Sequence, residues 1–281
     1  MPLAPVYPLS SHGAAPAPGA HPGYRGFPGG GSGRLPPPVL AAALGRAEWG
    51  VMDSSELLRA MHAGRVLDVG TGKGQFVGSL IEELGSYTEM VGIDLSDEGA
   101  AAFEEAFGHL PSVSFLVADA TAMPFADESF DTVAIAGSLH HLADPKLALS
   151  EMRRVLRSGG TFIVYEQFRD HQTRAELTHV RFHHWSEEIL GVAPRPTYRR
   201  AELLDLVRSL HLAGLQVLYD RDRSDPRDPI RIARFDAFVD DYLQRAAAQP
   251  RLVARGRRIR ARLHDVGIAF AGALFALGVK P

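Results

Sequence analysis

The sequence predicts an α/β fold built on a doubly wound, mostly parallel β-sheet. Three observations lead to this prediction. A short apolar run ends in a glycine-rich turn, further apolar runs alternate with helix-compatible runs over the next hundred residues, and acidic residues stand at the ends of several runs. Strands that alternate with helices in short units form parallel sheets. Such sheets bind ligands at the carboxyl ends of their strands, so we expect a ligand site at that edge.

The glycine-rich turn lies in residues 65–74, with the sequence RVLDVGTGKG. Gly70, Gly72 and Gly74 alternate with other residues, and glycine both reaches positive φ and lets a ligand approach bare backbone. The spacing differs from the G-x-G-x-x-G of dinucleotide-binding proteins. Asp68, two residues before the first glycine, would repel a pyrophosphate and attract a ligand that carries an ammonium and a sulfonium group.

The alternation of strands and helices continues beyond this turn. We expect strands at residues 66–69, 90–94, 113–118, 132–136 and 161–165. We expect helices at residues 75–84, 98–107 and 144–157. The side chains expected at the carboxyl ends of the strands are Asp68, Asp94, Asp119, Ser138 and Glu166.

Composition limits the classes of protein to consider. The chain has 281 residues, 46% of them hydrophobic, which is enough for one substantial α/β core. A net charge of −3 gives no global field toward nucleic acid or anionic membrane. The absence of cysteine excludes disulfides and thiolate metal sites. No apolar run reaches the roughly 18 residues of a membrane span, and the first residues do not resemble a secretory signal, so we expect a soluble cytoplasmic protein.

The first 45 residues differ in composition from the rest. Residues 1–45 are rich in Pro, Gly and Ala and are expected to be disordered. Asp53 and Glu56 fit a capping box that opens a short helix through Met61. The folded domain is therefore expected at residues 46–281.

Three further motifs accompany the glycine turn at a regular spacing. They are AMPFADESFD at residues 122–131, LHHLADP at 139–145 and RVLRSGG at 154–160. Together with the turn, they resemble the UbiE-like, type 11 branch of the class I S-adenosylmethionine (SAM) dependent methyltransferases over residues 66–164. The resemblance implies a Rossmann-like sheet of seven strands, the last of them antiparallel at the sheet edge, with SAM as the cofactor.

The resemblance also implies a set of cofactor contacts. Asp94 follows the glycine turn by about twenty residues, the distance at which a carboxylate reaches ribose hydroxyls. Asp119 is expected to accept a hydrogen bond from the adenine amino group, and the next backbone N–H to meet a ring nitrogen; otherwise Asp119 is a turn carboxylate. The expected cofactor-binding residues are Asp68, Gly70, Thr71, Gly72, Gly74, Asp94, Leu95, Asp119, Ala120, Gly137 and Ser138.

Residues 168–198 interrupt the alternation after the fifth strand. An insertion at this point lies over the ligand edge, so we expect a lid that selects the methyl acceptor, with Trp185 as a wall of its pocket. Beyond the lid, we expect helices at residues 200–210, 231–248 and 251–264, a strand at 215–219, and either a strand or a buried helix at 268–279.

Methyl transfer from a sulfonium is an in-line displacement that depends mainly on alignment and on exclusion of water. An oxygen, nitrogen or carbon nucleophile can also need a base, for which histidine has a suitable pKa. The candidate catalytic residues are His140, His141, Glu166, His183 and His184. Their alternative roles are to shape the pocket, to contact the acceptor, or, for Glu166, to cap or pair with the lid.

His179 and His183 are spaced i, i+4, the geometry of a two-histidine metal pair, and Glu176 could add a carboxylate. We favour a polar lid helix without a metal.

Two other functions remain open in the sequence. The arginines of residues 251–262 could bind RNA phosphates and make the chain a nucleic-acid methyltransferase. The fourth strand, however, ends in AGSL and not in the NPPY type of motif used on exocyclic amines. The other alternative is a protein that binds SAM without transferring methyl groups. We expect a small-molecule acceptor, with neither nucleic acid nor membrane as a partner.

Overall fold

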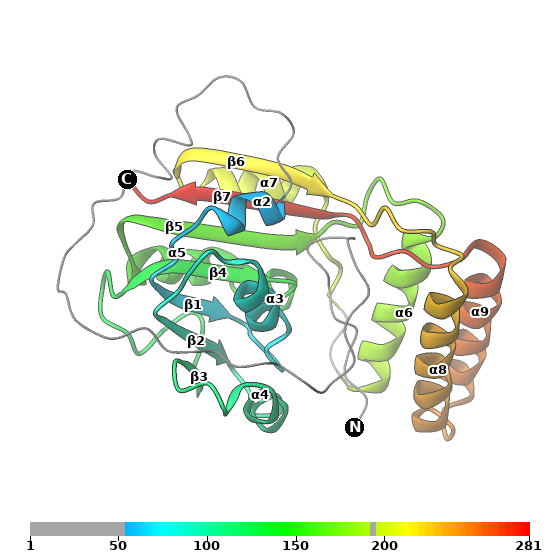
Figure 1. Ribbon diagram of the computed structural model, residues 1–281. Helices are drawn as coiled ribbons and strands as arrows, with labels where there is room; N and C mark the ends of the chain where they lie inside the picture. Colours follow the sequence, from blue (N-terminus) through cyan, green and yellow to red (C-terminus); the bar gives the residue numbers. More distant parts are fainter. Residues whose placement is uncertain (1–53, 192–194) are drawn as a thin grey trace.

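The computed structural model describes residues 54–191 and 195–281. The predicted disordered segment, the predicted cap residue Asp53 and residues 192–194 lie outside this range. The core is a seven-stranded sheet in the order β3-β2-β1-β4-β5-β7-β6, parallel except for β7 (Figure 1). This agrees with the predicted α/β fold and its doubly wound sheet.

The elements follow the chain in the predicted order. The strands are β1 (Arg65–Val69), β2 (Glu89–Asp94), β3 (Val113–Val117), β4 (Phe130–Ala136), β5 (Leu156–Gln167), β6 (Ala213–Asp220) and β7 (Ala273–Val279). The helices are α2 (Ser54–Arg59), α3 (Gln75–Glu83), α4 (Ala100–Phe107), the 3₁₀ turn η1 (Leu139–His141), α5 (Pro145–Val155), α6 (Glu176–Ile189), α7 (Arg200–Arg208), α8 (Pro229–Arg245) and α9 (Pro250–Val266).

The sheet buries both of its faces. Side chains alternate between the faces of a strand, so Leu67 and Val69 pack with α5 and α7, whereas Val66 packs with α2, α3 and α4. A fully buried aliphatic side chain contributes about 1.5–3 kcal/mol of transfer free energy. This two-sided burial holds the carboxyl ends of the central strands in a fixed arrangement.

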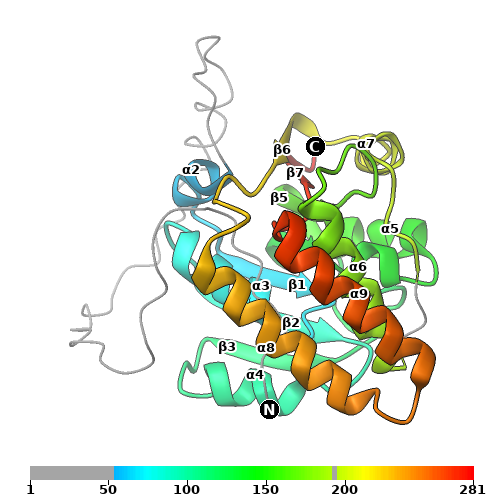
Figure 2. The same ribbon diagram turned by 90° about the vertical axis from the view of Figure 1, so that its right-hand side faces the viewer.

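A second, smaller core lies beyond the carboxyl ends of the parallel strands. Helices α6, α8 and α9 lie together at this end of the molecule (Figures 1 and 2). They pack on one another through Phe182, Phe235 and Leu252, among other apolar side chains. We call these three helices the lid bundle. The sequence predicts a lid in residues 168–198 alone, but α8 and α9, inserted between β6 and β7, form most of the bundle.

The structure corrects three details of the prediction. Strand β5 begins at Leu156 and not at residue 161, because it pairs with β4 from Phe130 onward through an irregular register. Residues 268–279 form a strand and not a helix, but only from Ala273. This strand is antiparallel, as expected, yet it lies between β5 and β6, so the edge strand is β6.

Among the described residues, no helix is both long and apolar enough to span a membrane.

Candidate functional site

The three glycines of the turn after β1 have different roles, although all have positive φ. A Cβ on Gly70 would lie 2.6 Å from Cβ of Ser138, and one on Gly74 would lie 2.4 Å from the Phe107 ring. Gly70 and Gly74 therefore make room for other parts of the protein. A Cβ on Gly72 would meet nothing within 4 Å. Gly72 thus presents bare backbone to open space.

Two side chains hold this turn to the neighbouring strands. Oδ2 of Asp94, at the end of β2, accepts a hydrogen bond from the Gly72 amide at 2.9 Å, and Oδ1 accepts one from Ser96 at 3.2 Å. The hydroxyl of Ser138, just after β4, donates to the Gly70 carbonyl at 2.8 Å. Residues from β1, β2 and β4 are thereby joined at the carboxyl edge, as the sequence predicts.

Asp68 is a buried carboxyl group of β1, 1% exposed. Its pKa is raised to about 7, mainly by burial; a hydrogen bond with Thr71 acts in the opposite direction, and the negative charge of Asp94 adds a smaller increase. A carboxyl group with such a pKa is sensitive to any cation placed nearby, because a positive charge favours its ionised form. Asp68 does not line either of the cavities described next.

A cavity of about 600 Å³ lies at the ends of β2, β3 and β4, and we call it the strand-end cavity. Leu95 is on its wall with 74% of its surface exposed. Oδ1 of Asp119 accepts hydrogen bonds from the amide and the hydroxyl of Thr121, both at 2.8 Å, so this carboxylate forms the turn that was its alternative role. These bonds lower the pKa of Asp119. Ala120 lines the same wall.

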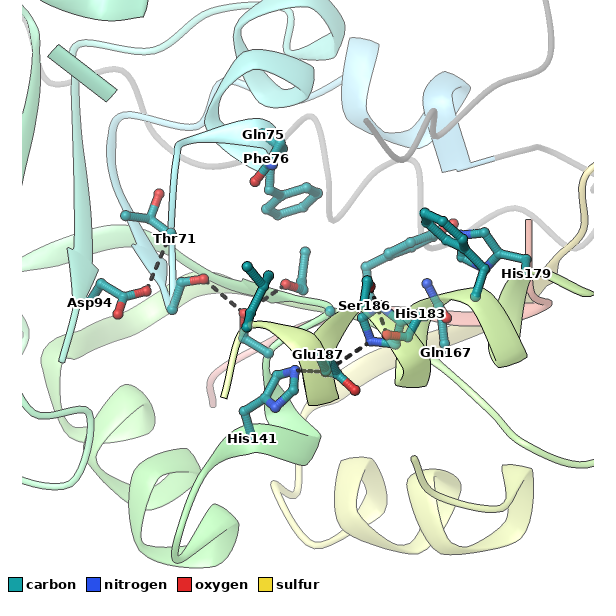
Figure 3. A pocket seen from close by; sticks show the side chains of 18 of the residues that line it. Thr71, Gln75, Phe76, Asp94, His141, Gln167, His179, His183, Ser186 and Glu187 are labelled. Carbon is teal, nitrogen blue, oxygen red and sulfur yellow. Dashed lines mark hydrogen bonds and ion pairs between the residues drawn. The ribbon is translucent and has the colours of Figure 1, made fainter. Parts of the chain in front are cut away.

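A second cavity of about 300 Å³ lies between the sheet edge and the lid bundle, and we call it the lid cavity (Figure 3). Its walls come from the glycine turn, α3, β5, α6 and α8, and several of its side chains are aromatic: Phe76, Tyr165, Phe182 and Tyr242. The two cavities share five lining residues: Gly70, Asp94, Ser138, His141 and Glu187. They are therefore two halves of one site that meet at the glycine turn.

His140 and Glu166 form a buried pair behind this site. Nδ1 of His140 lies 3.0 Å from Oε1 of Glu166, whose oxygens also accept hydrogen bonds from the amides of Leu139 and Gln167 at 2.8 and 2.9 Å. Burial opposes a charge on His140, but Glu166 outweighs it and the pKa of His140 is raised. Neither residue is part of a cavity wall. Glu166, predicted as a possible acceptor contact, instead fixes the position of η1.

His141 and His183 do line the lid cavity, and Glu187 joins them (Figure 3). Nε2 of each ring lies 3.2 Å from Oε1 of Glu187. Burial and the neighbouring His140 lower the pKa of His141 to about 4. Burial alone would raise the pKa of Glu187, but the imidazoles beside it, His183 first, outweigh burial and lower that pKa. His140, His141, His183 and Glu187 form what we call the imidazole cluster.

Three other lid residues considered in the sequence analysis lie outside both cavities. His184 follows His183 on α6 but lines neither cavity. Trp185 is fully buried in the lid bundle, where Nε1 donates to the Leu252 carbonyl at 2.9 Å, so it is not a pocket wall. Glu176, considered as a metal partner of His179, instead forms an ion pair with Arg221 at 2.9 Å.

His179 is fully buried at the wall of the lid cavity. Burial lowers its pKa to about 3. The ion-pair partner of His183 on α6 is Glu187, one turn later. The spacing in the sequence had pointed to His179, one turn earlier.

Sequence reasoning missed several residues of the site, among them Glu187 and Tyr242. Glu187 follows His183 by four residues on α6, and this spacing was a usable signal that we applied only to the preceding turn. Tyr242 reaches the lid cavity from α8, and its position depends on how the lid bundle assembles. No local pattern identifies it.

Comparisons with known proteins agree with this geometry. Residues 67–164 match the family model described as "Methyltransferase domain". The chain is 34% identical over 112 residues to the ubiquinone/menaquinone biosynthesis C-methyltransferase UbiE of Geotalea uraniireducens, which covers 39% of this chain and 48% of that protein. It is 36% identical over 102 residues to the demethylmenaquinone methyltransferase of Staphylococcus aureus, which covers 36% of this chain and 42% of that protein. The chain thus spans less than half the length of these curated relatives.

Solved structures resemble the whole described fold. The YcgJ protein of Bacillus subtilis has a TM-score of 0.53 and 20% identity, covering 80% of this chain and 96% of that one. The MccD protein has a TM-score of 0.51 and 17% identity, covering 77% and 90%. At these identities the likeness establishes the fold alone.

Proposed function

We propose that this chain is a class I SAM-dependent methyltransferase of the UbiE-like branch and that it transfers a methyl group from SAM to a small-molecule acceptor. Residues 67–164 match the methyltransferase family model, and the chain is similar to UbiE over 112 residues. The observation that carries the proposal is the pair of cavities that share the glycine turn. One half, of about 600 Å³, offers polar groups that suit a nucleoside, and the other half is lined by aromatic side chains under the lid bundle.

The residues at the strand ends fit SAM. Gly72 and Gly137 have positive φ, and a Cβ on either would meet nothing within 4 Å, which leaves space for a ligand against the backbone. Asp94, on the wall of both cavities, is placed to accept hydrogen bonds from ribose hydroxyls. The exposed side chain of Leu95 offers an apolar surface for adenine, with Asp119 beside it. The strand-end cavity would then hold the adenosine moiety.

The chemistry of SAM is that of a methyl group made electrophilic by its sulfonium. The chain's task is to align an acceptor with that methyl group and to exclude water. Of the five predicted catalytic residues, His141 and His183 line the lid cavity. The low pKa of His141 keeps its imidazole neutral at pH 7, so it is able to accept a hydrogen bond from the acceptor. His140 and Glu166 support η1 from behind.

The aromatic lining of the lid cavity favours an acceptor with a flat or apolar ring. Two relatives are named for methylation in quinone biosynthesis, so demethylmenaquinol analogues belong in the first test panel, with phenols and amines beside them. The functional experiment measures SAM binding by calorimetry and then transfer of a labelled methyl group to this panel.

Formation of S-adenosylhomocysteine with a methylated product supports the proposal. SAM binding without transfer to any acceptor supports a protein that uses the fold for other chemistry, and absence of SAM binding refutes the cofactor assignment.

The structure supports RNA binding by α9 less strongly than the sequence does. Arg255 forms an ion pair with Glu188 at 2.7 Å, and Arg260 forms one with Asp236 at 3.1 Å, so part of the charge on α9 is used inside the lid bundle. The exposed arginines that remain are Arg251, Arg257 and Arg258. A salt-dependent gel shift with structured RNA is the test, and we expect none.

A further inference from the structure

The imidazole cluster joins two separate parts of the fold. His140 and His141 belong to η1 at the end of β4, whereas His183 and Glu187 belong to α6 of the lid bundle. One ligand atom from each residue can be chosen so that all four atoms lie within 4.8 Å of one another. We propose that the imidazole cluster is a binding site for a divalent transition metal of the zinc class, which clasps the lid helix to the sheet.

The spacing suits such an ion. Ligand atoms held at about 2 Å from a tetrahedral zinc ion lie roughly 3.3 Å apart. Oε1 of Glu187 lies 3.2 Å from Nε2 of His141 and 3.2 Å from Nε2 of His183. All four ligand atoms lie within 4.8 Å of one another, so the widest separation is at most about 1.5 Å longer than the tetrahedral value, a difference that rotation of the side chains would close.

His140 is prepared as a ligand. Its Nδ1 faces Oε1 of Glu166 at 3.0 Å, and a carboxylate accepts hydrogen bonds, so in the neutral ring Nδ1 carries the proton and Nε2 keeps its lone pair. Nε2 is buried and has no hydrogen-bond partner in the described part of the chain. A carboxylate that orients a histidine in this way is the usual partner of a metal-bound imidazole. Glu166 is in turn fixed by two backbone amides.

The buried carboxylates at the cluster also favour binding of a cation. Glu166 and Glu187 are both buried, 0% and 6% exposed. Within residues 54–191 and 195–281, their ion-pair partners are imidazoles alone. Both oxygens of Glu187 are buried, and no described residue donates a hydrogen bond to either of them. A divalent ion would neutralise the two carboxylates and use the free lone pairs.

Three imidazoles and one carboxylate form a set that suits zinc and its neighbours better than calcium or magnesium, which prefer oxygen ligands. Four protein ligands complete a tetrahedral shell, which is typical of structural sites and not of catalytic ones. The ion therefore acts as a clasp. When bound, the ion occupies the imidazole lone pair that His141 otherwise offers to the methyl acceptor. Methyl transfer then depends on alignment of the acceptor and on exclusion of water.

The test uses the untagged full chain, treated with chelator and desalted. Cobalt(II) is titrated while its visible absorption is followed, and zinc is then added in competition. We expect one ion per chain with a dissociation constant below about 1 µM and the intense absorption of tetrahedral cobalt. We also expect slower amide hydrogen exchange in residues 176–190 when zinc is present, because the clasp restrains α6.

Variants locate the ion. Glu187→Gln keeps the size of the side chain and should weaken cobalt binding at least ~100-fold, and His183→Ala should do the same. Glu166→Gln, which acts through His140, should weaken it by ~10-fold or more. The matched control is His184→Ala, which removes the adjacent histidine of the same helix and should leave the affinity unchanged. Circular dichroism and SAM binding confirm that each variant is folded.

Three results would overturn the proposal. They are no cobalt or zinc binding at 100 µM, unchanged affinity in Glu187→Gln, and an equal loss in His183→Ala and His184→Ala. The first would mean that protonated imidazoles alone neutralise Glu166 and Glu187. None of these results bears on SAM binding, so the two proposals can fail separately.

Discussion

The two halves of the site differ in how they are built. The strand-end half consists of short local segments, each placed by the strand that precedes it, and Asp94 reaches back to hold the Gly72 amide at 2.9 Å. The lid half is assembled from β5, η1, α6 and α8, which are distant in sequence. The difference indicates that the cofactor half is fixed by the sheet, whereas the acceptor half depends on the packing of the lid bundle.

The largest effect should follow a change at the backbone of the strand-end half. Gly72→Val places a branched side chain in the open space beside the turn, so we expect SAM affinity to fall at least ~100-fold. The matched control is Gly159→Val. Gly159 also has positive φ and open space around its missing Cβ, but it lines neither cavity. Calorimetry that finds equal losses in both variants would show that strain, and not ligand volume, is responsible.

The ionisation of Asp68 gives a pH-dependent effect on stability. The unfolded chain releases this proton near pH 4 and the folded chain near pH 7. Between these values the folded state holds one more proton, so rising pH lowers the free energy of unfolding, by at most about 4 kcal/mol in total. Above pH 7 the contribution is constant.

The matching variant is Asp68→Asn, which cannot ionise. Its stability relative to the wild type should rise from pH 4 to pH 7 and then level off, as measured by urea unfolding at several pH values. A difference that does not depend on pH would contradict the raised pKa.

A smaller loss is expected at the junction of the two halves. Asp94→Ala should weaken SAM binding by about 1.5–3 kcal/mol, because hydrogen bonds from the ribose to a carboxylate are lost. Asp119→Ala should cost less, since Asp119 already serves its own turn through Thr121. Calorimetry on both variants tests this ranking. A larger loss of SAM affinity in Asp119→Ala than in Asp94→Ala would show that adenine recognition dominates the binding.

The smallest effect on SAM should come from the lid bundle. A Cβ on Gly256 of α9 would lie 2.3 Å from the Trp185 ring. Gly256→Ala should therefore push α9 away from α6 and destabilise the protein by about 1–3 kcal/mol. We expect a raised KM for the acceptor and unchanged SAM affinity. A matching loss of SAM affinity would show that the two halves are one mechanical unit.

These contrasts also explain what could be predicted from the sequence. The turn at Gly70–Gly74 and the acid at Asp94 follow from local rules about strands, tight turns and spacing, so their positions were predicted correctly. Trp185 was placed in the pocket because nothing in residues 168–198 indicates that α9 will cover it. Glu187 was overlooked although its i, i+4 spacing from His183 is a local signal; only its second partner, His141, lies on another element. Side chains that act through tertiary contacts leave little local signal.

The position of β7 has a consequence for the order of folding. Strand β6 pairs with β7 alone in the described sheet, and β7 follows it only after residues 221–272. Joining the two strands closes a long loop, and the entropy of that closure opposes their pairing. Helices α8 and α9 contact each other within this loop and also contact α6, which shortens the free chain to be closed. We therefore expect the lid bundle, which covers the site, also to help bring β7 into the sheet. A substitution that destabilises the bundle should slow refolding even where the cavity lining is unchanged.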